Sequence, residues 1–318
     1  MLTRTTIVLS LTLIDERMPK TSLKTFLLIT LITCIWGTTW LVIKIGLDGV
    51  SPLLGAGLRF LVAGTTLSLI ARMRGRKRPH GNRAISHVIV FGIFMFSIPY
   101  GLVYWGEQYI PSSLASIIFS AMPFWVIFFA HLLIPAERFN VKQGLGTVLG
   151  FIGIILIFSD GEFNLSDNFT LGMLAVLGST ACSGFASVWG KRFTNEIDTL
   201  STTAYGMMFG SLLLLIFSQF ESARHLSPDL LTIGSIVYLG IFGSAVTFSV
   251  YFRLMRKIAV VKLSFITFLS PIVAIFSGWI ILGETLGAHV FLGTTLVFLG
   301  IFTADAKRYI SVFRRPQP

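Results

Sequence analysis

Two basic residues lie inside long apolar runs of this sequence, where a charge is costly to place. Lys44 follows Trp36 and Trp40 at a spacing of four, so the three side chains share one stripe of a helix. Arg59 lies about two turns into the next apolar run. Such cations are expected to attract an anionic group such as a carboxylate, while the tryptophans contact an apolar part of the same ligand.

Three of these four residues also have a structural interpretation. The Lys44 side chain can snorkel to the headgroup region, and Trp40 can belong to the interfacial aromatic belt. Arg59 can pin helix ends through backbone carbonyls or through Glu107. The residue types alone leave both interpretations open.

Hydroxyl groups follow one face of a third apolar run, beside Pro99, which frees a backbone carbonyl. They are Ser97, Tyr100 and Tyr104, and a later run offers Ser244, Thr247 and Tyr251 at corresponding places. Hydroxyls beside a broken helix are candidate substrate ligands. Alternatively, the Ser and Thr side chains bond their own preceding turn and the tyrosines lie at an interface.

The elements that carry these residues occur twice. The segment LGTVLGFIGI at 145–154 returns as LGTTLVFLGI at 292–301. The same separation pairs Lys44 with Lys191 and matches Trp36 and Trp40 with two serines, Ser183 and Ser187. We therefore predict two homologous halves, 22–158 and 170–305, whose aromatic and hydroxyl stripes face each other.

The composition indicates a membrane protein. The chain has 318 residues, of which 54% are hydrophobic and 12% charged, with a mean hydropathy of +0.81. Bilayer-length apolar runs lie near 25–45, 53–71, 86–105, 113–133, 142–158, 171–190, 200–219, 231–252, 261–282 and 287–304. Each is expected to be helical, because lipid leaves an open backbone without partners. The predicted fold class is an all-α integral membrane protein with ten transmembrane helices.

The basic residues predict the orientation rather than a nucleic-acid partner. Of the 25 Lys and Arg residues, all but Lys44, Arg59 and Arg224 fall in segments that would share one face of the membrane. That face is expected to be cytoplasmic, with an amino-terminal segment 1–21 and a basic tail 306–318 on it and the connection 159–169 outside. Translation is expected to begin at Met18, whose sequence MPKTSLK directly precedes the first apolar run.

Five helices in each half make the second copy enter the membrane from the opposite side, so the repeat is inverted. Many secondary transporters form one site between two such halves, which rock between two openings. Pro99, Pro123 and Pro271 are candidate hinges, or static bends that shape the bundle. The glycines of the fifth and tenth runs indicate close helix packing, either within the chain or at a homodimer contact.

Several other classes are disfavoured. The Asp and Glu residues all fall in loops or at helix ends, so proton coupling has no visible carrier within the membrane. The sequence holds no P-loop, GxSxG, HExxH or Cys/His cluster pattern, and its two cysteines, Cys34 and Cys182, lie in apolar runs. We therefore predict neither an enzyme nor a bound cofactor or metal.

Three stretches resemble a known family. They are CIWGTTWLVIKIGLDGVSPLLGAGLRF, SSLASIIFSAMPFWVIFFAHLLIPAERF with its Gly-rich helix, and VKLSFITFLSPIVAIFSGWIILGETLGAHVFLGTTLVFLGI. They are similar to the EamA domain, the unit of ten-helix drug/metabolite transporters, and the resemblance covers about 22–305. The sequence departs from it at PAER and at GET without a following basic residue.

The resemblance implies export of small organic metabolites, such as amino acids or toxic amphipathic compounds, across a bacterial inner membrane by alternating access. An exchanger of phosphorylated sugars or nucleotides is the alternative within transport, since a phosphate would want two basic ligands. A non-transporting membrane partner protein is the alternative outside it. The expected partners are a small-molecule substrate and the lipid bilayer.

Overall fold

The computed structural model describes residues 20–134, 140–157, 167–193, 198–222, 224–273 and 288–313, and the regular structure in these ranges is helical. Seven helices are long and apolar enough to span a bilayer: Leu23–Leu47, Pro52–Met73, Gly81–Gly106, Ser112–Leu133, Asp167–Arg192, Thr199–Phe220 and Leu230–Met255. Three shorter apolar helices are Val141–Leu156, Val260–Val273 and Phe291–Thr303. The predicted all-helical fold with ten apolar helices is confirmed.

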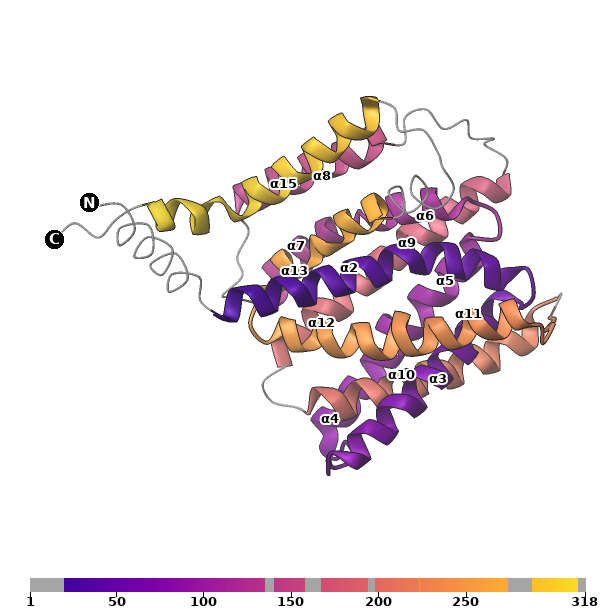
Figure 1. The fold of residues 1–318 in the computed structure, drawn as a ribbon. Helices are drawn as coiled ribbons and strands as arrows, with labels where there is room; N and C mark the ends of the chain where they lie inside the picture. Colours follow the sequence, from indigo (N-terminus) through magenta and orange to yellow (C-terminus); the bar gives the residue numbers. More distant parts are fainter. Residues whose placement is uncertain are drawn as a thin grey trace, which may run out of the picture.

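Six spans are single helices in Figure 1: α2 (Lys20–Leu47), α3 (Pro52–Met73), α8 (Val141–Ile157), α9 (Asp167–Phe193), α10 (Thr199–Phe217) and α15 (Ala288–Phe313). The third span consists of α4 (Gly81–Phe91), η1 (Gly92–Ser97) and α5 (Ile98–Gly106), and the eighth of α11 (Leu230–Gly240), η3 (Ile241–Val246) and α12 (Thr247–Met255). The fourth span is divided into α6 (Ser112–Phe119) and α7 (Met122–Leu133), α13 (Val260–Ser264) opens the ninth, and η2 (Ser218–Phe220) extends α10.

The third and eighth spans each contain a π-helical turn, η1 and η3, at nearly corresponding places of the two repeats. Pro99 lies in the first turn of α5, just after η1. The residue corresponding to Pro99 in the second half is Val246, so a proline is not needed for this turn. Because both repeats share it, the wide turn is a feature of the scaffold, and such turns are frequent at functional sites.

The fourth and ninth spans are interrupted where they meet. The fourth breaks between α6 and α7, with Pro123 in the first turn of α7. The ninth departs from α-helix at Phe265, before Pro271. The Ser120 hydroxyl donates to the backbone carbonyl of Thr267 across 3.0 Å, at a sequence separation of 147. All three candidate hinge prolines therefore lie near helix irregularities, and their role in motion stays a prediction.

The glycine-rich helices α8 and α15 pack on each other, as Figure 1 shows above the other helices. A Cβ atom on Gly153 would lie 2.6 Å from the Gly293 carbonyl oxygen, and one on Gly300 would lie 2.5 Å from that of Gly146. Only glycine permits this approach. Packing within one chain thus accounts for these glycines, and the homodimer stays a prediction.

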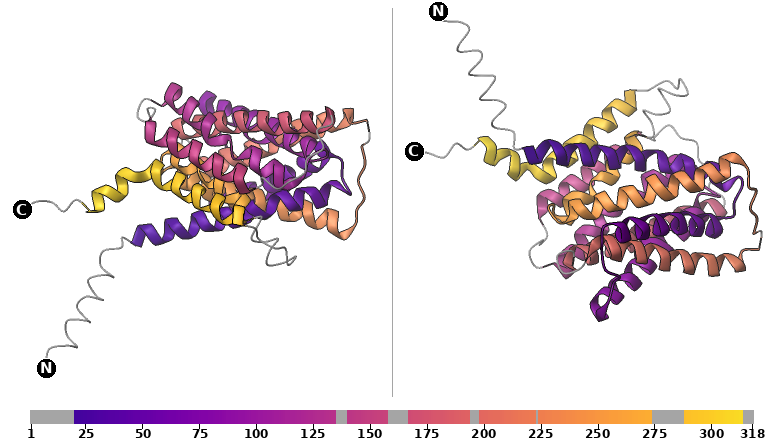
Figure 2. Two further views of the ribbon diagram at one scale, coloured as in Figure 1. Left: turned by 90° about the horizontal axis from the view of Figure 1, so that it is seen from above. Right: turned by 60° about the horizontal axis from the view of Figure 1, so that its bottom comes forward.

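Connections from both halves join at one end of the bundle, which we call the Val50 end. Val50 and Leu226 form an isolated antiparallel bridge, the Ser51 amide donates to the His225 carbonyl at 3.1 Å, and the Ser227 amide donates to Gly49 at 2.7 Å. The start of α2 and the end of α15 both lie at the opposite end in Figures 1 and 2. The charge distribution predicts that the Val50 end is extracytoplasmic.

The apolar side chains divide into those that are buried between helices and those that are exposed on the outside of the bundle. Phenylalanines such as Phe60, Phe96 and Phe252 are fully buried between helices. Other large apolar side chains, such as Phe26, Leu69 and Leu230, remain exposed on the outside of the bundle. An apolar exterior on this scale suits a lipid environment, because water would make it a severe aggregation hazard.

Candidate functional site

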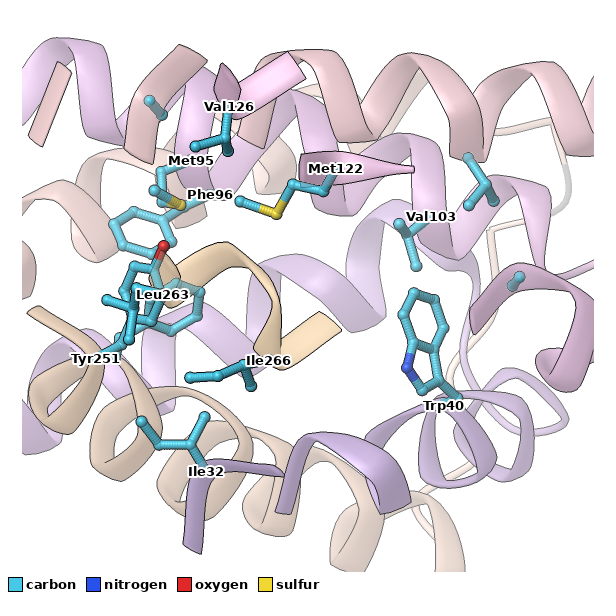
Figure 3. Packing of buried hydrophobic residues seen from close by; sticks show 14 of the residues in the cluster. Ile32, Trp40, Met95, Phe96, Val103, Met122, Val126, Tyr251, Leu263 and Ile266 are labelled. Atoms are coloured by element: carbon cyan, nitrogen blue, oxygen red, sulfur yellow. The ribbon is translucent and has the colours of Figure 1, made fainter. Parts of the chain in front are cut away.

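A cavity of about 70 Å³ lies between the two halves. Its wall from the first half comprises Trp36, Thr39, Trp40, Ile43, Arg59, Met95, Pro99, Tyr100, Val103, Ser116, Phe119 and Met122, and its wall from the second comprises Ser183, Ser187, Phe248, Tyr251, Leu263, Ser264, Thr267 and Ser270. Figure 3 shows Trp40 and Val103 on one side of this region and Tyr251 with Leu263 on the other. The volume is sufficient for several water molecules.

The two predicted stripes meet in this cavity. Trp36 and Trp40 from α2 line it together with Ser183 and Ser187 from α9. The Trp36 Nε1–H donates to the Thr247 hydroxyl at 3.1 Å, and the Trp40 Nε1–H donates to the Ser270 hydroxyl at 3.3 Å. Both indoles are thereby held across the boundary between the halves.

Lys44 lies outside the cavity wall. Its Nζ donates to the backbone carbonyl of Glu107 at the end of α5. Lys191, its counterpart in the second half, donates to the carbonyls of Met255 at 2.6 Å and Ile258 at 2.9 Å, at the end of α12. A cation favours a helix C-terminus, where the last carbonyls lack intrahelical donors. Both lysines therefore cap the ends of equivalent helices.

Arg59 is 1% exposed and belongs to the cavity wall. Its Nε donates to the Ser244 hydroxyl at 2.8 Å, and Nη2 donates to the Gly243 carbonyl at 3.2 Å, so the guanidinium binds the π-helical turn η3 of the other half. The guanidinium carbon also lies 4.6 Å from the centre of the Tyr100 ring. The buried Nη1 has no hydrogen-bond partner. The structural role and an anion-binding role are thus compatible in one side chain.

The hydroxyl residues of the third and eighth spans divide into two groups. Tyr100 and Tyr251 line the cavity, and the Tyr251 hydroxyl donates to Ser187 at 3.3 Å. Thr247 is buried behind Trp36 and donates to the Gly243 carbonyl at 2.8 Å. Tyr104 is buried outside the wall, and Ser97 lines a separate open hollow of about 630 Å³ near Glu221. Hence Ser97, Tyr104, Thr247 and Lys44 do not line the cavity.

Sequence reasoning missed the contribution of the fourth and ninth spans. Ser116 and Phe119 precede the break in the fourth span, and Ser264, Thr267 and Ser270 surround the break in the ninth. A signal was present, since Ser116 and Ser264 are separated by 148 residues and each precedes a proline by seven. The residues that surround the broken helices therefore form one side of the cavity.

The chemistry available in this cavity is that of binding. It combines aromatic faces, several hydroxyls and one guanidinium group. Within the described ranges there is no group of three or more His, Cys, Asp or Glu side chains that could hold a metal ion. The arrangement suits an organic molecule with an apolar part and a polar end.

A multi-pass helical bundle with a cavity between two repeated halves is typical of membrane transport proteins. Two regions of the chain, 23–159 and 170–304, each match the EamA-like transporter family. The chain belongs to this family, a family of transporters rather than enzymes.

Related chains are similar over nearly their whole length. The uncharacterized transporter YoaV of Bacillus subtilis is 30% identical over 280 residues, which cover 88% of this chain and 96% of that protein. The uncharacterized inner membrane transporter YedA of Escherichia coli is 29% identical over 282 residues, 87% of this chain and 89% of that protein. A solved crystal structure with 17% identity has a TM-score of 0.75 and covers 89% of this chain and 97% of its own; it shows the same fold.

Proposed function

We propose that this transporter exports small organic metabolites that carry an apolar part and a carboxylate, amino acids above all, by alternating access. The observation that carries the proposal is Arg59, whose Nη1 has no hydrogen-bond partner and which forms part of an aromatic cavity between the two halves. A carboxylate is a matched acceptor for a guanidinium N–H in a site shielded from water.

The apolar part of the substrate would lie against Trp36, Trp40 and Phe119. Trp40 and Phe119 already form an edge-to-face pair with ring centres 5.3 Å apart, and Trp36 contacts Tyr251 at 5.5 Å. Aromatic walls of this kind accept flat or aliphatic groups and also offer ring faces to a cation.

The hydroxyls favour a substrate that donates hydrogen bonds. Ser116, Ser264 and Thr267 donate their protons to carbonyls of their own preceding turns, at 2.6–2.8 Å. Each oxygen keeps lone pairs that can accept from an N–H group. An α-ammonium group satisfies these acceptors, while the α-carboxylate binds Arg59, which supports amino acids within the wider class of carboxylates.

Alternating access would require the halves to separate at the Val50 end. The contacts there include the backbone bonds of Gly49 and Ser51 to the 225–227 segment. The Glu221 carboxylate also accepts from the amides of Leu53 at 2.8 Å and Leu54 at 3.3 Å. Among the described residues these bonds lie at connections and at the first turn of α3, so they can break without disrupting a helix. The broken helices near Pro99, Pro123 and Pro271 would bend as they do so.

We place the protein in the bacterial inner membrane with both termini cytoplasmic. The relative YedA is described as an inner membrane transporter, and the positive-inside pattern supports this orientation. An exchanger of phosphorylated sugars is a weaker proposal, because Lys44 binds a helix end and Arg59 is the basic residue in the described cavity wall.

Counterflow in proteoliposomes tests the proposal without an ion gradient. Vesicles loaded with an unlabelled compound are expected to take up the labelled form of phenylalanine and of N-acetylphenylalanine, which both carry a carboxylate. Phenylalaninamide, a cationic dye and glucose 6-phosphate are expected to move at least tenfold more slowly. Exchange of the amide or of the sugar phosphate in place of the carboxylates would overturn the proposed substrate class.

Arg59 is tested in the same assay. We expect Arg59→Gln to lower phenylalanine counterflow by at least about tenfold, the equivalent of one charge-assisted hydrogen bond. Arg72→Gln is the matched control, because Arg72 is an exposed arginine in the last turn of the same helix. Folded Arg59→Gln protein that exchanges phenylalanine at the wild-type rate would remove the anion-binding role.

A further inference from the structure

The open hollow of about 630 Å³ at the Val50 end is separate from the cavity between the halves. It is bounded by the first turn of α3, by η1 and α5, and by the end of α10 with η2. Its volume lies within the range of about 300–1,000 Å³ that is usual for small-molecule sites. Within the described ranges the two walls share no residue, so the cavity does not account for this hollow.

The wall of the hollow is polar at its rim and mostly apolar at depth. Ser51, Gln108 and Glu221 lie in the connections that follow or precede the helices. Ile98 lies eight residues before the end of α5 at Gly106, which places it about 12 Å deeper along the helix axis. Further apolar wall residues are Leu53, Leu102, Leu214 and Phe217. A ligand that fits this wall has a polar head and an apolar tail.

The hollow opens on the outside of the bundle. Four of its wall residues, Ile98, Tyr109, Phe217 and Phe220, are exposed large apolar side chains. The outside of spanning helices faces lipid, and aromatic residues are typical of the boundary between lipid and water. Trp105 and Tyr109 form such a pair in the wall, with ring centres 5.0 Å apart. Lipid molecules therefore have direct access to the hollow.

Glu221 is the charged residue of the described wall. Its carboxylate accepts from the amides of Leu53 and Leu54, so the first turn of α3 fixes its position. A carboxylate has about four acceptor positions, and these bonds use two of them. Arg224, the cation nearest to it in the sequence, donates to the Gln219 side chain at 2.9 Å. The remaining acceptor positions suit an ammonium group, and the negative charge disfavours an anionic head.

Ser51 supplies a second polar group at the same rim. It is 2% exposed, and among the described residues its hydroxyl has no hydrogen-bond partner. Buried hydroxyls normally have a partner, since an unpaired one is costly. Ser51 is the N-cap of α3, the helix whose first turn binds Glu221. Its O–H is thus available to donate to a phosphate oxygen of the same ligand.

The repeat shows that the scaffold does not require the acid. The counterpart of Glu221 at a separation of 147 is Arg74, the C-cap of α3. A cation is favourable at a helix C-terminus and an acid is not. The end of α10 therefore does not explain Glu221, whereas its place between α3 and the hollow does.

We propose that this hollow binds phosphatidylethanolamine from the leaflet at the Val50 end. The ammonium group of the lipid donates to Glu221, the Ser51 hydroxyl donates to its phosphate, and one acyl chain lies along Ile98 and Leu214. A choline head has no N–H donor for the carboxylate, and a glycerol head leaves the phosphate charge unbalanced beside it. The bound lipid contacts both halves of the chain, and this inference is independent of the substrate of the cavity.

Native mass spectrometry of the delipidated protein in mild detergent tests the proposal. Phosphatidylethanolamine, phosphatidylcholine and phosphatidylglycerol with identical acyl chains are titrated separately. The wild type is expected to bind its first phosphatidylethanolamine at least about tenfold more tightly than either other lipid, the equivalent of one charge-assisted hydrogen bond. Glycerophosphoethanolamine, which has the same head without chains, is expected to bind at least about tenfold more weakly than the lipid, because it leaves the apolar wall uncovered.

Two variants with matched controls locate the site. Glu221→Gln is expected to weaken phosphatidylethanolamine binding about tenfold, while Asp48→Asn, which changes an exposed acid at the same end, should match the wild type. Ile98→Trp fills the deep part of the hollow and leaves the Glu221 contacts in place, and it should weaken binding at least as much. Ile89→Trp is its control, because Ile89 is similarly exposed in the same span and lies outside the wall.

Each part of the proposal has an outcome that overturns it. Equal affinity of the wild type for phosphatidylethanolamine and phosphatidylglycerol overturns the assignment of the head. Unchanged affinity in Glu221→Gln or in Ile98→Trp, or an equal loss in either control, overturns the location. Glycerophosphoethanolamine that binds as tightly as the lipid would assign the hollow to a soluble amine in place of a lipid.

Discussion

The ends of the third and eighth spans are equivalent in the repeat but differ in charge. At the end of α5, Lys44 from the first span binds a helix carbonyl beside the buried acid Glu107. At the end of α12, Lys191 binds two carbonyls beside the apolar Leu254. The lysine is shared and therefore belongs to the scaffold. The acid is present on one side only, so the shared scaffold does not require it.

The largest effect is expected when the second half is given the acid of the first. Leu254 is 2% exposed, and the counterpart of Arg59 there is Gly206. Leu254→Glu would bury a carboxyl group without a guanidinium, at a cost of about 3–5 kcal/mol. The apparent melting temperature in detergent should fall sharply, while that of the control Leu254→Met should change little. Wild-type stability of Leu254→Glu would mean that the asymmetry has no electrostatic basis.

Substitution of the two shared lysines should destabilise the protein less than Leu254→Glu does. The two lysine variants should also differ from each other in stability. Lys191→Met loses two hydrogen bonds to carbonyls, and Lys44→Met loses one. We expect destabilisation of about 1.5–3 kcal/mol for Lys191→Met and a smaller loss for Lys44→Met, since hydrogen bonds to charged groups are the stronger ones. Equilibrium unfolding in mixed micelles measures both. The reverse order would show that Lys44 acts mainly on Glu107 rather than on the helix end.

A double-mutant cycle sharpens the comparison further. Arg59→Gln and Glu107→Gln, alone and combined, should show a favourable coupling free energy of about 1 kcal/mol, within the range for interacting neighbours. Lys191→Met combined with Arg59→Gln is the control, because Arg59 binds the π-helical turn η3 whereas Lys191 binds the far end of α12, and its coupling should be near zero. Additive effects of the Arg59 and Glu107 substitutions would contradict the electrostatic link between them.

The π-helical turns provide a smaller test. The turn in η3 forms without a proline, so Pro99→Ala should leave the fold intact and change stability by less than about 1 kcal/mol. Thermal unfolding checks stability, and counterflow checks the hinge role. Loss of transport at full stability would assign Pro99 to the motion, whereas loss of the fold would show that the first half depends on its proline.

The smallest effect is expected at the start of the eighth span. Asp229 caps α11 by accepting hydrogen bonds from the Thr232 amide and hydroxyl. These bonds lower the pKa of its carboxyl, and the bond from the amide has the larger effect. His80 precedes α4 without a side-chain cap. Asp229→Ala should slightly lower the melting temperature at pH 7, and His80→Ala should not. Because the folded-state pKa of Asp229 is depressed, its carboxylate stabilises the folded protein fully above the ordinary pKa of Asp. The difference in melting temperature between the wild type and Asp229→Ala should therefore vanish as the pH falls through the folded-state pKa. A difference that grows in acid would exclude this mechanism.

Much of the architecture follows from the sequence. Long apolar runs predict spanning helices because lipid offers the backbone no partners. The repeat predicts two halves, and the spacing of four predicts that Trp36 and Trp40 share a stripe. The structure indeed brings both residues, with Ser183 and Ser187, to one cavity.

Tertiary structure alone decided which polar residues enter the cavity. In a soluble protein, polarity separates the exterior from the core, but in a membrane protein both are apolar, so helical periodicity cannot tell which stripe faces inward. Lys44 and Ser97 were therefore predicted as ligands alongside Arg59 and Tyr100, yet they lie outside the wall. Glu107 was correctly expected at a helix end. That this end is buried between α2, α3 and α9, with its carboxyl oxygens unpaired, depends on how distant helices pack, and a position along the chain carries no information about that.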